Sequence, residues 1–362
     1  MNRIILLIFI ILLVCISLPA EEQKEPILFY HEDYGTPQLN DLLDEFDFDD
    51  TIVSAETEFE QITALKNWVF YNIYFKHNYP MGALRNALSI LRYAETGKSF
   101  HCVHFAATFM QCSLSLGWTT RYMFVQNIKN ELHAINEIWS NQYNKWIMID
   151  VTWNIHIEVD GIPLSGLEIR NEWIKNNGQD LVYVFGTTEN EAKYLYEDLP
   201  VSRDDNNAWI WWPLDDIYMT YFYEIAYIGR NNFFSSGDGN GSNIYDYVYI
   251  IKDELNENDY DWDFRFSEDI DDINALYHDI NRIDISYDYI DWDTVQIKLD
   301  AFGEYNYTPN LENFLIRIDD GEWHDTSDSF FWNLNDGRNV LYARVENKFN
   351  RLGPVYQIEI IN

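Results

Sequence analysis

Three residues that could form a nucleophile, a base and an orienting group follow one another along the chain as Cys102, His133 and Asp150. A cysteine thiolate can attack an amide carbonyl, an imidazolium can protonate the leaving amine, and a carboxylate can fix the tautomer of the imidazole. The backbone N–H of Cys102 would be one donor to the oxyanion that forms. This set predicts acyl transfer through a thioester on Cys102.

The sequence around Cys102 predicts how the nucleophile is positioned. The stretch from Gly97 to Gly117 reads as a loop followed by an apolar helix, because apolar residues recur at helical spacing between Phe105 and Leu114. Gly117 is the expected end of this helix. A cysteine in the first turn meets unpaired N–H groups and the positive end of the helix dipole, and both favour the thiolate.

The base and the orienting group fall on a predicted hairpin. Strand candidates at 132–139 and 145–151 are joined by a polar segment. If the turn is centred between Asn141 and the residue after it, His133 lies directly opposite Asp150. Their Cβ atoms would then be about 4.5–5.5 Å apart.

Each member of this set also has a purely structural interpretation. Taken singly, Cys102 is a buried thiol, His133 a strand histidine with satisfied hydrogen bonds, and Asp150 a turn or edge carboxylate. A metal site formed by His101, Cys102 and His104 is a further alternative. Structural zinc takes four ligands, usually in paired spacings, and the sequence offers no second cluster. We therefore expect no metal and no cofactor.

Further motifs surround the three residues in a fixed order. They are Leu116-Gly-Trp-Thr-Thr-Arg121, then His133-Ala134 with Trp139, then Trp146-Ile-Met-Ile-Asp150-Val-Thr152-Trp153. With a cysteine opening a helix ahead of them, they resemble the transglutaminase-like core of the papain-like cysteine enzymes over residues 60–155. The resemblance implies helices packed on an antiparallel sheet, a catalytic triad of Cys102, His133 and Asp150, and action on amide bonds of proteins or peptides.

The chain departs from the family pattern in two places. The family usually has glycine two residues before the cysteine, where this chain has Phe100 followed by His101. We therefore expect bulky side chains at the approach to the thiol. The family also has a second oxyanion donor upstream of the cysteine. Trp68 is the candidate for this donor, and the alternative interpretation makes Trp68 a core residue.

Composition and pattern divide the chain into segments. They are a signal peptide at 1–20, an acidic arm at 21–55, the transglutaminase-like core at 56–200, an aromatic and acidic accessory region at 201–284, and a β-sandwich at 285–362. The fold class is therefore α+β. Within the core, helices are expected over 56–75, 84–94 and 167–175, and a further strand over 120–126. The accessory region is either a β-rich domain or an extension of the core.

The C-terminal segment has the pattern of an all-β unit. Short alternating strands recur at 294–299, 314–318, 340–345 and 355–360. Asp-Gly dipeptides between them are tight-turn signals. Short strands without helices predict an immunoglobulin-like or fibronectin-like sandwich.

The N-terminus predicts export. One positive charge, an unbroken apolar run and then Glu21 and Glu22 are typical of a signal peptide, here with cleavage after Ala20. Lipid attachment at Cys15 is an alternative, although Val14 stands where a small residue is wanted. We expect the protein to be secreted, periplasmic or associated with the cell surface, with no membrane span after cleavage.

The remaining cysteines are Cys102 and Cys112, ten residues apart in one predicted helix. That spacing corresponds to roughly 15 Å along a helix. A disulfide needs a much shorter separation, so the two thiols cannot pair within this helix. Cys112 is then expected to be a small buried hydrophobe.

The chain is strongly acidic, with 24 Lys and Arg against 60 Asp and Glu and a net charge of −36. Phosphate backbones and anionic membrane surfaces repel such a protein, which argues against nucleic acid as a partner. We expect a protein or peptide substrate. The resemblance favours hydrolysis over crosslinking. The alternative is a non-catalytic exported binding or adhesion protein that retains the transglutaminase-like fold.

Overall fold

The computed structural model describes much of the core and nearly all of the C-terminal unit. The described residues are 29–48, 52, 54–75, 85–126, 132–186, 191–195, 222, 224–235, 248–251, 267–270, 276–303 and 306–362. The expected signal peptide, with Cys15 and the cleavage site after Ala20, lies outside these residues.

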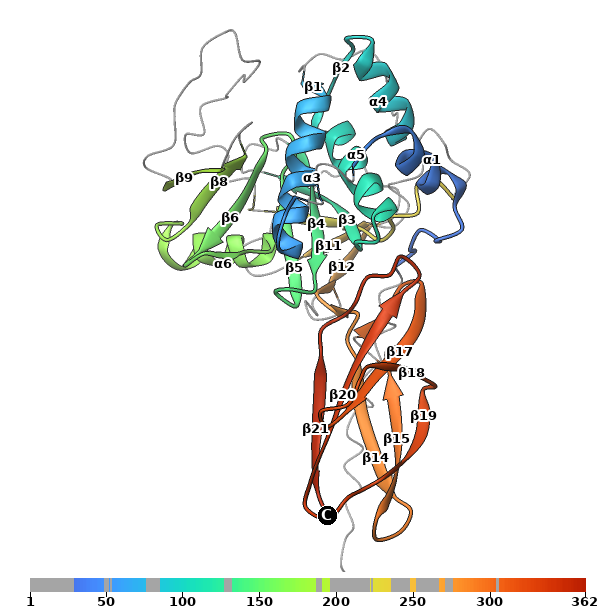
Figure 1. Cartoon of the computed structure of the whole chain (residues 1–362). Helices are drawn as coiled ribbons and strands as arrows, with labels where there is room; N and C mark the ends of the chain where they lie inside the picture. Colours follow the sequence, from blue (N-terminus) through green and yellow to red (C-terminus); the bar gives the residue numbers. More distant parts are fainter. Residues whose placement is uncertain are drawn as a thin grey trace, which may run out of the picture.

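Within the described part of the core, four helices form one layer: α1 (Pro37–Glu45), α3 (Glu58–Asn72), α4 (Ala87–Glu95) and α5 (Cys102–Ser115). Side-chain caps explain two of the starts. The Thr57 hydroxyl accepts from the Glu60 N–H ahead of α3, and the Asn86 side chain accepts from the Ser89 N–H ahead of α4. Both predicted helices are present but begin at these caps, later than expected. The other three helices all contact α5, which is the centre of the layer (Figure 1).

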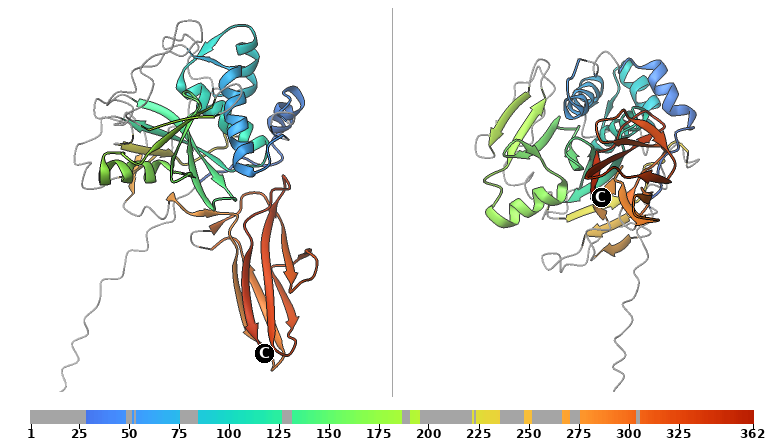
Figure 2. Two further views of the ribbon diagram at one scale, coloured as in Figure 1. Left: turned by 60° about the vertical axis from the view of Figure 1, so that its left-hand side comes forward. Right: turned by 60° about the horizontal axis from the view of Figure 1, so that its bottom comes forward.

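A six-stranded sheet packs against this layer, in the order β12-β11-β10-β3-β4-β5. Its strands are β3 (Thr120–Gln126), β4 (Leu132–Ser140), β5 (Lys145–Ile149), β10 (Glu224–Ile228), β11 (Val248–Ile251) and β12 (Ser267–Ile270). Neighbouring strands are antiparallel except β11 and β12. Figures 1 and 2 show the helices on one face of the sheet. The strands described between residues 224 and 270 thus extend the sheet of the core.

Strand β3 shows why the sheet is buried on both sides. Tyr122 and Phe124 face the helices, whereas Met123 and Val125 belong to a second hydrophobic cluster on the opposite face. Side chains of a strand alternate between faces, so a strand with both faces covered is apolar at every position. α5 contacts both β3 and β4, and the helix that carries Cys102 therefore rests on the strands that lead to the predicted base.

The register of the β4–β5 hairpin corrects one prediction. Direct pairing of His133 with Asp150 is wrong, because Asn136 pairs with Ile149 and the turn is centred one residue later than expected. Moving the centre of a turn by one residue shifts the pairing by two positions. Since side chains alternate with a period of two, both residues still point to the same face. They are diagonal rather than direct neighbours.

A smaller antiparallel sheet, in the order β7-β6-β8-β9, lies beside the core. It comprises β6 (Ile155–Val159), β7 (Ile162–Pro163), β8 (Val182–Gly186) and β9 (Glu191–Leu195). Helix α6 (Gly166–Asn176) accounts for the helix predicted at 167–175. It begins at a capping box between Ser165 and Glu168 and ends at Asn177, whose φ of 56° is left-handed.

The C-terminal residues form two antiparallel sheets around one hydrophobic core. One sheet has the order β14-β15-β19 and the other β18-β17-β20-β21. The strands are β14 (Asp284–Tyr289), β15 (Thr294–Asp300), β17 (Leu311–Ile318), β18 (His324–Thr326), β19 (Ser329–Asn333), β20 (Arg338–Asn347) and β21 (Tyr356–Ile361). Val295 and Trp332 of the first sheet meet Leu341 and Val345 of the second in this core. All four strands predicted here are present, and Figure 2 shows them in an elongated unit.

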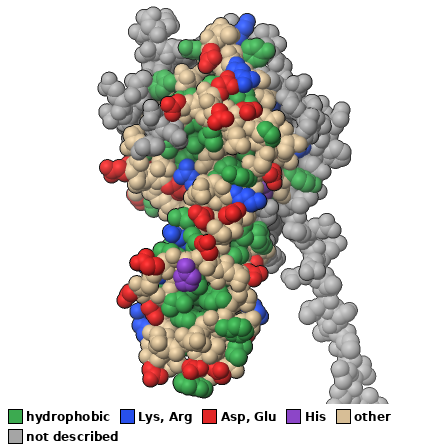
Figure 3. Space-filling view, turned by 45° about the vertical axis from the view of Figure 1, so that its right-hand side comes forward, with side chains coloured by type: hydrophobic (Ala, Val, Ile, Leu, Met, Phe, Trp, Pro, Cys, Tyr) green, Lys and Arg blue, Asp and Glu red, His purple; other side chains and the backbone are tan. Residues whose placement is uncertain are grey.

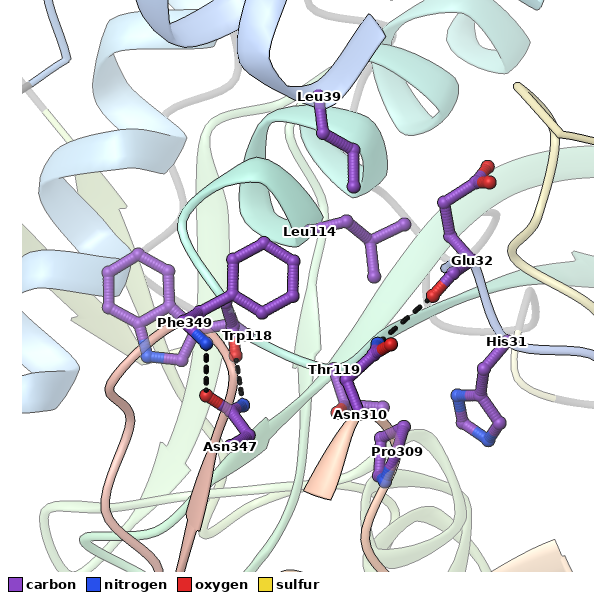
Figure 4. A pocket seen from close by; sticks show the side chains of 11 residues that line it. His31, Glu32, Leu39, Leu114, Trp118, Thr119, Pro309, Asn310, Asn347 and Phe349 are labelled. Atoms are coloured by element: carbon purple, nitrogen blue, oxygen red, sulfur yellow. Dashed lines mark hydrogen bonds between the residues drawn. The ribbon is translucent and has the colours of Figure 1, made fainter. Parts of the chain in front are cut away.

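The end of β20 and the loop that follows it join the two parts of the molecule. Asn347 Nδ2 donates to the Gly117 carbonyl at 3.2 Å, and Arg351 Nε donates to the Leu116 carbonyl at 2.8 Å. The Arg351 guanidinium also lies 3.9 Å from the centre of the Trp118 ring. These contacts cap the C-terminal end of α5, where carbonyl groups lack partners within the helix. Figure 4 shows the Asn347 bond and Trp118 beside the loop.

Two observations require glycine at position 117, the second residue after the last helical residue of α5. Gly117 has a φ of +86°, which favours glycine strongly. A Cβ atom at this position would also lie 2.5 Å from Cβ of Phe349. The predicted helix end is therefore confirmed, and the same glycine lets the C-terminal unit approach the core.

Acidic side chains occur on both parts of the molecule in the face shown in Figure 3, in keeping with the net charge of −36. Among the described residues, none of the helices has the length and apolar character needed to cross a membrane.

Candidate active site

The Cys102 thiol is held at the start of α5 by a short parallel pair of strands. Strand β2 (Ser99–Phe100) pairs with β1 (Tyr74–Phe75), which fixes the backbone just before the helix. His101 is the residue that precedes the first helical turn, and its N–H donates to His104 Nδ1 at 3.2 Å. Cys102 is 4% exposed. The predicted position at a helix N-terminus is therefore confirmed, with the thiol largely buried.

His133 and Asp150 meet at the edge of the sheet next to this helix. His133 Nε2 lies 2.7 Å from Asp150 Oδ2. Asp150 is fully buried, and its backbone exchanges two hydrogen bonds with Ile155, at 3.0 and 2.9 Å. The N–H of Trp153 also donates to Asp150 Oδ1, at 3.3 Å. These bonds hold the Asp150 carboxylate in place independently of its contact with the imidazole.

The pKa values of the thiol and the imidazole are shifted in opposite directions. Burial acts to raise the pKa of Cys102, but hydrogen bonds and charges of His101 and His133 lower it to about 6. Burial acts to lower the pKa of His133, but the charge and hydrogen bond of Asp150, with a contribution from Cys102, raise it to about 10. Between these values the stable form is a thiolate beside an imidazolium.

The tautomer of His133 follows from its partners. Because Nε2 is bonded to Asp150, Nδ1 is the ring nitrogen left to face Cys102, with which the imidazole also interacts. The proton that leaves the sulfur can therefore reside on Nδ1. This arrangement supplies a nucleophile, an acid that can protonate a leaving group, and a carboxylate that stabilises the imidazolium.

Aromatic rings flank the three polar groups. The Phe75 ring centre lies 6.1 Å from that of His101 and 6.2 Å from that of Trp153. The Trp153 ring in turn lies 6.3 Å from that of His133. Such apolar walls lower the local dielectric and strengthen the charge interactions between them.

The two bulky residues that precede the nucleophile lie in different environments. Phe100 is fully buried and packs beside His104, with ring centres 5.4 Å apart. His101 instead turns toward the nucleophile, with Nδ1 3.1 Å from Cys102 Sγ. From the sequence, His101 was expected to be steric bulk or a metal ligand, and this contact was not predicted. Its position directly before the cysteine was the available signal.

The other predicted site residues have the following surroundings. Trp68 packs edge-on against Phe46 and Phe48 at ring distances of 6.0 and 4.7 Å. These contacts match the interpretation of Trp68 as a core residue. Cys112 is fully buried, burial raises the pKa of its thiol, and neither cysteine is in a disulfide. The described part of the chain contains no group of three or more potential metal ligands.

Comparisons with known proteins bear on this site. Among solved structures, a candidate cysteine protease from Cytophaga hutchinsonii shares 17% identity over 33% of this chain and 39% of its own, with a TM-score of 0.27. A structure described as a TGase shares 16% identity over 32% of this chain and 31% of its own, with a TM-score of 0.25.

The red sea bream transglutaminase shares 10% identity over 91% of this chain and 59% of its own, with a TM-score of 0.30. The matches thus span less than two thirds of each of these three chains. A comparison with curated proteins gives no match. Residues 47–151, which include Cys102, His133 and Asp150, match the model of the transglutaminase-like superfamily and form a transglutaminase-like domain.

Proposed function

We propose that this protein is an exported cysteine enzyme of the transglutaminase-like type. It acts on amide bonds of proteins or peptides through a thioester on Cys102, and it favours hydrolysis over crosslinking. The observation that carries the proposal is the 2.7 Å bond between His133 and a fully buried Asp150, next to a thiol whose pKa is lowered to about 6.

The proposed acylation step uses the charges already present in the resting site. The Cys102 thiolate attacks the amide carbonyl carbon, and a C–S bond forms while the carbonyl oxygen takes the negative charge. The Cys102 N–H, which belongs to the first turn of α5, is directed at this oxygen. The C–N bond then breaks, the amine leaves with the proton from His133, and a thioester remains.

The second step releases the product. Neutral His133 accepts a proton from water, and the hydroxide attacks the thioester carbonyl. The C–S bond breaks, the carboxylic acid leaves, and the thiolate and imidazolium are restored. In a crosslinking reaction an amine would take the place of water. Asp150 holds the imidazole in one tautomer through both steps.

The rest of the proposal concerns regions outside the catalytic domain. Export rests on the sequence of residues 1–20. The two C-terminal sheets with a common core are the basis for proposing an immunoglobulin-like unit. The 4% exposure of Cys102 favours a second candidate, a non-catalytic binding or adhesion protein that retains the transglutaminase-like fold.

Thiol alkylation at mildly acidic pH tests the proposal. At about pH 6.5 an ordinary cysteine is on the order of 1% thiolate, whereas a thiol with a pKa near 6 is mostly ionised. We expect iodoacetamide to modify Cys102 roughly fivefold faster than a free thiol, because the larger thiolate fraction outweighs the weaker nucleophilicity of a thiolate of low pKa. Cys112, buried and with a raised pKa, is the internal control.

Two outcomes separate the candidates. Fast modification of Cys102, together with a trapped thioester on incubation with a peptide library, supports the enzyme. The Cys102→Ala variant is the blank for both measurements. If Cys102 reacts no faster than a free thiol at this pH, the ion-pair mechanism is wrong and the binding protein is favoured.

A further inference from the structure

The Cys102 thiol interacts with two imidazoles rather than one. His101 Nδ1 lies 3.1 Å from Sγ, within hydrogen-bonding distance for sulfur. His133, on β4, approaches the same sulfur while its other nitrogen bonds Asp150. His101 is partly exposed, whereas His133 is buried. The two imidazoles therefore differ both in partners and in access to solvent.

The position of His101 is set by its neighbours. Its N–H donates to His104 Nδ1, which places the residue at the entrance of α5. The preceding residue, Phe100, is paired with β1 and buried. The His101 ring lies at an angle of 32° to that of Phe75. These three contacts leave the imidazole directed at the sulfur.

We propose that His101 is a second imidazole partner of the Cys102 thiolate, donating a hydrogen bond from Nδ1–H to Sγ while His133 holds the proton taken from the sulfur. This rests on the proposed function, because it describes the nucleophile of that reaction. His101 contacts the reacting atom and is in this sense a catalytic residue. Its contribution is to keep the sulfur ionised before attack.

The surroundings of His101 shift its pKa in both directions. The bond to Cys102 is the largest influence and raises the pKa of His101, whereas burial and the positive charges of His133 and Arg85 lower it. Phe75 contributes an uncharged ring, and His104 contacts the backbone of His101. Because the net pKa is raised, His101 carries a positive charge beside the thiolate in the mildly acidic range. Loss of this charge would make the thiolate less stable.

The inference gives a specific pH signature. The rate of Cys102 alkylation is measured from about pH 5 to 9 in full-length protein that carries Cys15→Ala and Cys112→Ala, so that Cys102 is the single thiol that reports. The acidic limb of this profile is the rise in rate that follows ionisation of Cys102. His101→Gln removes the positive charge and the imidazole hydrogen bond, and it is expected to move this limb to higher pH by about one unit. Alkylation near pH 6 would then fall several-fold. His101→Lys, which restores a positive charge, should bring the limb back toward its original position.

A matched control is His324→Gln, which removes an exposed histidine in the C-terminal unit and should leave the profile unchanged. Circular dichroism and thermal melting establish that each variant is folded. The unsubstituted site offers a second measurement, by NMR of the histidine rings. Blocking Cys102 with iodoacetamide removes the thiolate and is expected to lower the pKa of His101.

The outcomes distinguish this inference from the proposed function. If the His101→Gln profile coincides with the starting profile, or the pKa of His101 does not change when Cys102 is blocked, His101 is no partner of the thiolate. The proposed function would stand in that case. If even the unsubstituted protein has a thiol of ordinary pKa, the proposed function fails first.

Discussion

At the scale of single residues, Cys102 and His133 are both neutral in an unfolded chain near neutral pH, and they form an ion pair in the folded protein. In the folded protein the pKa of the thiol is lowered from 9.0 to about 6, and that of the imidazole is raised from 6.5 to about 10. Between about pH 6.5 and 9 the pair holds one proton in either state, on sulfur when unfolded and on nitrogen when folded. Since the proton count is equal, the pair contributes almost no pH dependence to stability in this window.

Cys102→Ser should reveal the pH dependence of stability that the raised pKa of His133 produces on its own. Serine does not ionise in this range, so only the shift of His133 remains. The charge and hydrogen bond of Asp150 keep the pKa of His133 raised. Its contribution to stability is fully present below about pH 6.5 and is lost as pH rises through the folded pKa. We expect the free energy of unfolding to fall by about 1 kcal/mol per pH unit relative to the unsubstituted protein between pH 7 and 8.5.

Urea unfolding at several pH values measures this slope. Cys112→Ala removes a thiol that is buried and neutral, so its curve should run parallel to that of the unsubstituted protein. Parallel curves for Cys102→Ser as well would show that the thiol and the imidazole do not share a proton.

The sequence indicates which residue types are able to act but not how each side chain is oriented. Cys102, His133 and Asp150 were accessible to prediction because their chemistry and their order along the chain are informative. The adjacent pair Phe100 and His101 was not. Packing decides that the phenyl ring enters the core and that the imidazole turns to the sulfur.

At the scale of elements, the β4–β5 hairpin explains why an imperfect prediction still brought two residues together. The strands were predicted within two residues, but the centre of the turn was not, because several polar residues could each occupy it. A shift of two pairing positions preserves the face of every side chain. The long His133 and short Asp150 side chains can then meet across the diagonal.

The arginine of the sequence motif after α5 has a structural role in the fold. Arg121 Nε donates to Glu137 Oε2 at 2.9 Å, and both side chains are buried. The guanidinium lies 4.1 Å from the centre of the Trp146 ring and 4.2 Å from that of Tyr227. The other oxygen of Glu137 accepts from the Gly166 N–H at 2.7 Å, at the start of α6. This ion pair therefore links β3, β4, β5, β10 and α6.

Arg121→Met should be strongly destabilising because it leaves the Glu137 carboxylate buried without a counter-charge. We expect a loss of about 3–5 kcal/mol in the free energy of unfolding. The matched control is Arg338→Met, which breaks an exposed pair with Glu359 and should cost less than about 1 kcal/mol. Urea titrations of both variants measure the difference. Equal losses would mean that the Arg121 pair is not a structural link.

At the scale of the whole molecule, the C-terminal unit contacts the end of α5 opposite to the nucleophile. A helix of this length separates its two ends by roughly 20 Å. The cavity of about 410 Å³ near this junction is lined by residues of α1, by Leu116 and by the loop from Lys348 to Arg351. Tyr34 adds an edge-on ring contact with Phe349 at 4.8 Å. The N-terminal segment, the nucleophile helix and the C-terminal unit therefore share one junction.

Arg351→Ala should loosen this junction. The variant loses the bond to the Leu116 carbonyl and the stacking on Trp118, which together stabilise the docked state by about 2 kcal/mol. We expect a lower melting temperature and faster cleavage by protease between the core and the C-terminal unit. Arg338→Ala, in the same unit but exposed, is the control. Unchanged cleavage in Arg351→Ala would show that other contacts hold the two parts together.

The sequence predicted the strands of the C-terminal unit but gave no sign of its docking. Period-two patterns and turn residues are local signals, so the four strands from residue 294 onward were accessible. The contact of Asn347 with the Gly117 carbonyl joins positions far apart in the chain and has no local pattern. Gly117 was correctly predicted to end the helix. Its second role, which is to allow the close approach of Phe349, is visible only in the structure.

The close approach of Gly117 to Phe349 has a consequence for how this sequence can change over evolutionary time. A side chain at position 117 would collide with the phenylalanine, even in a protein whose backbone tolerated the left-handed conformation. A substitution at position 117 is therefore tolerated only if the residue at position 349 also changes. Among descendants of this chain, the two positions should be inherited as a pair, although one follows the helix of the nucleophile and the other belongs to a separate β unit.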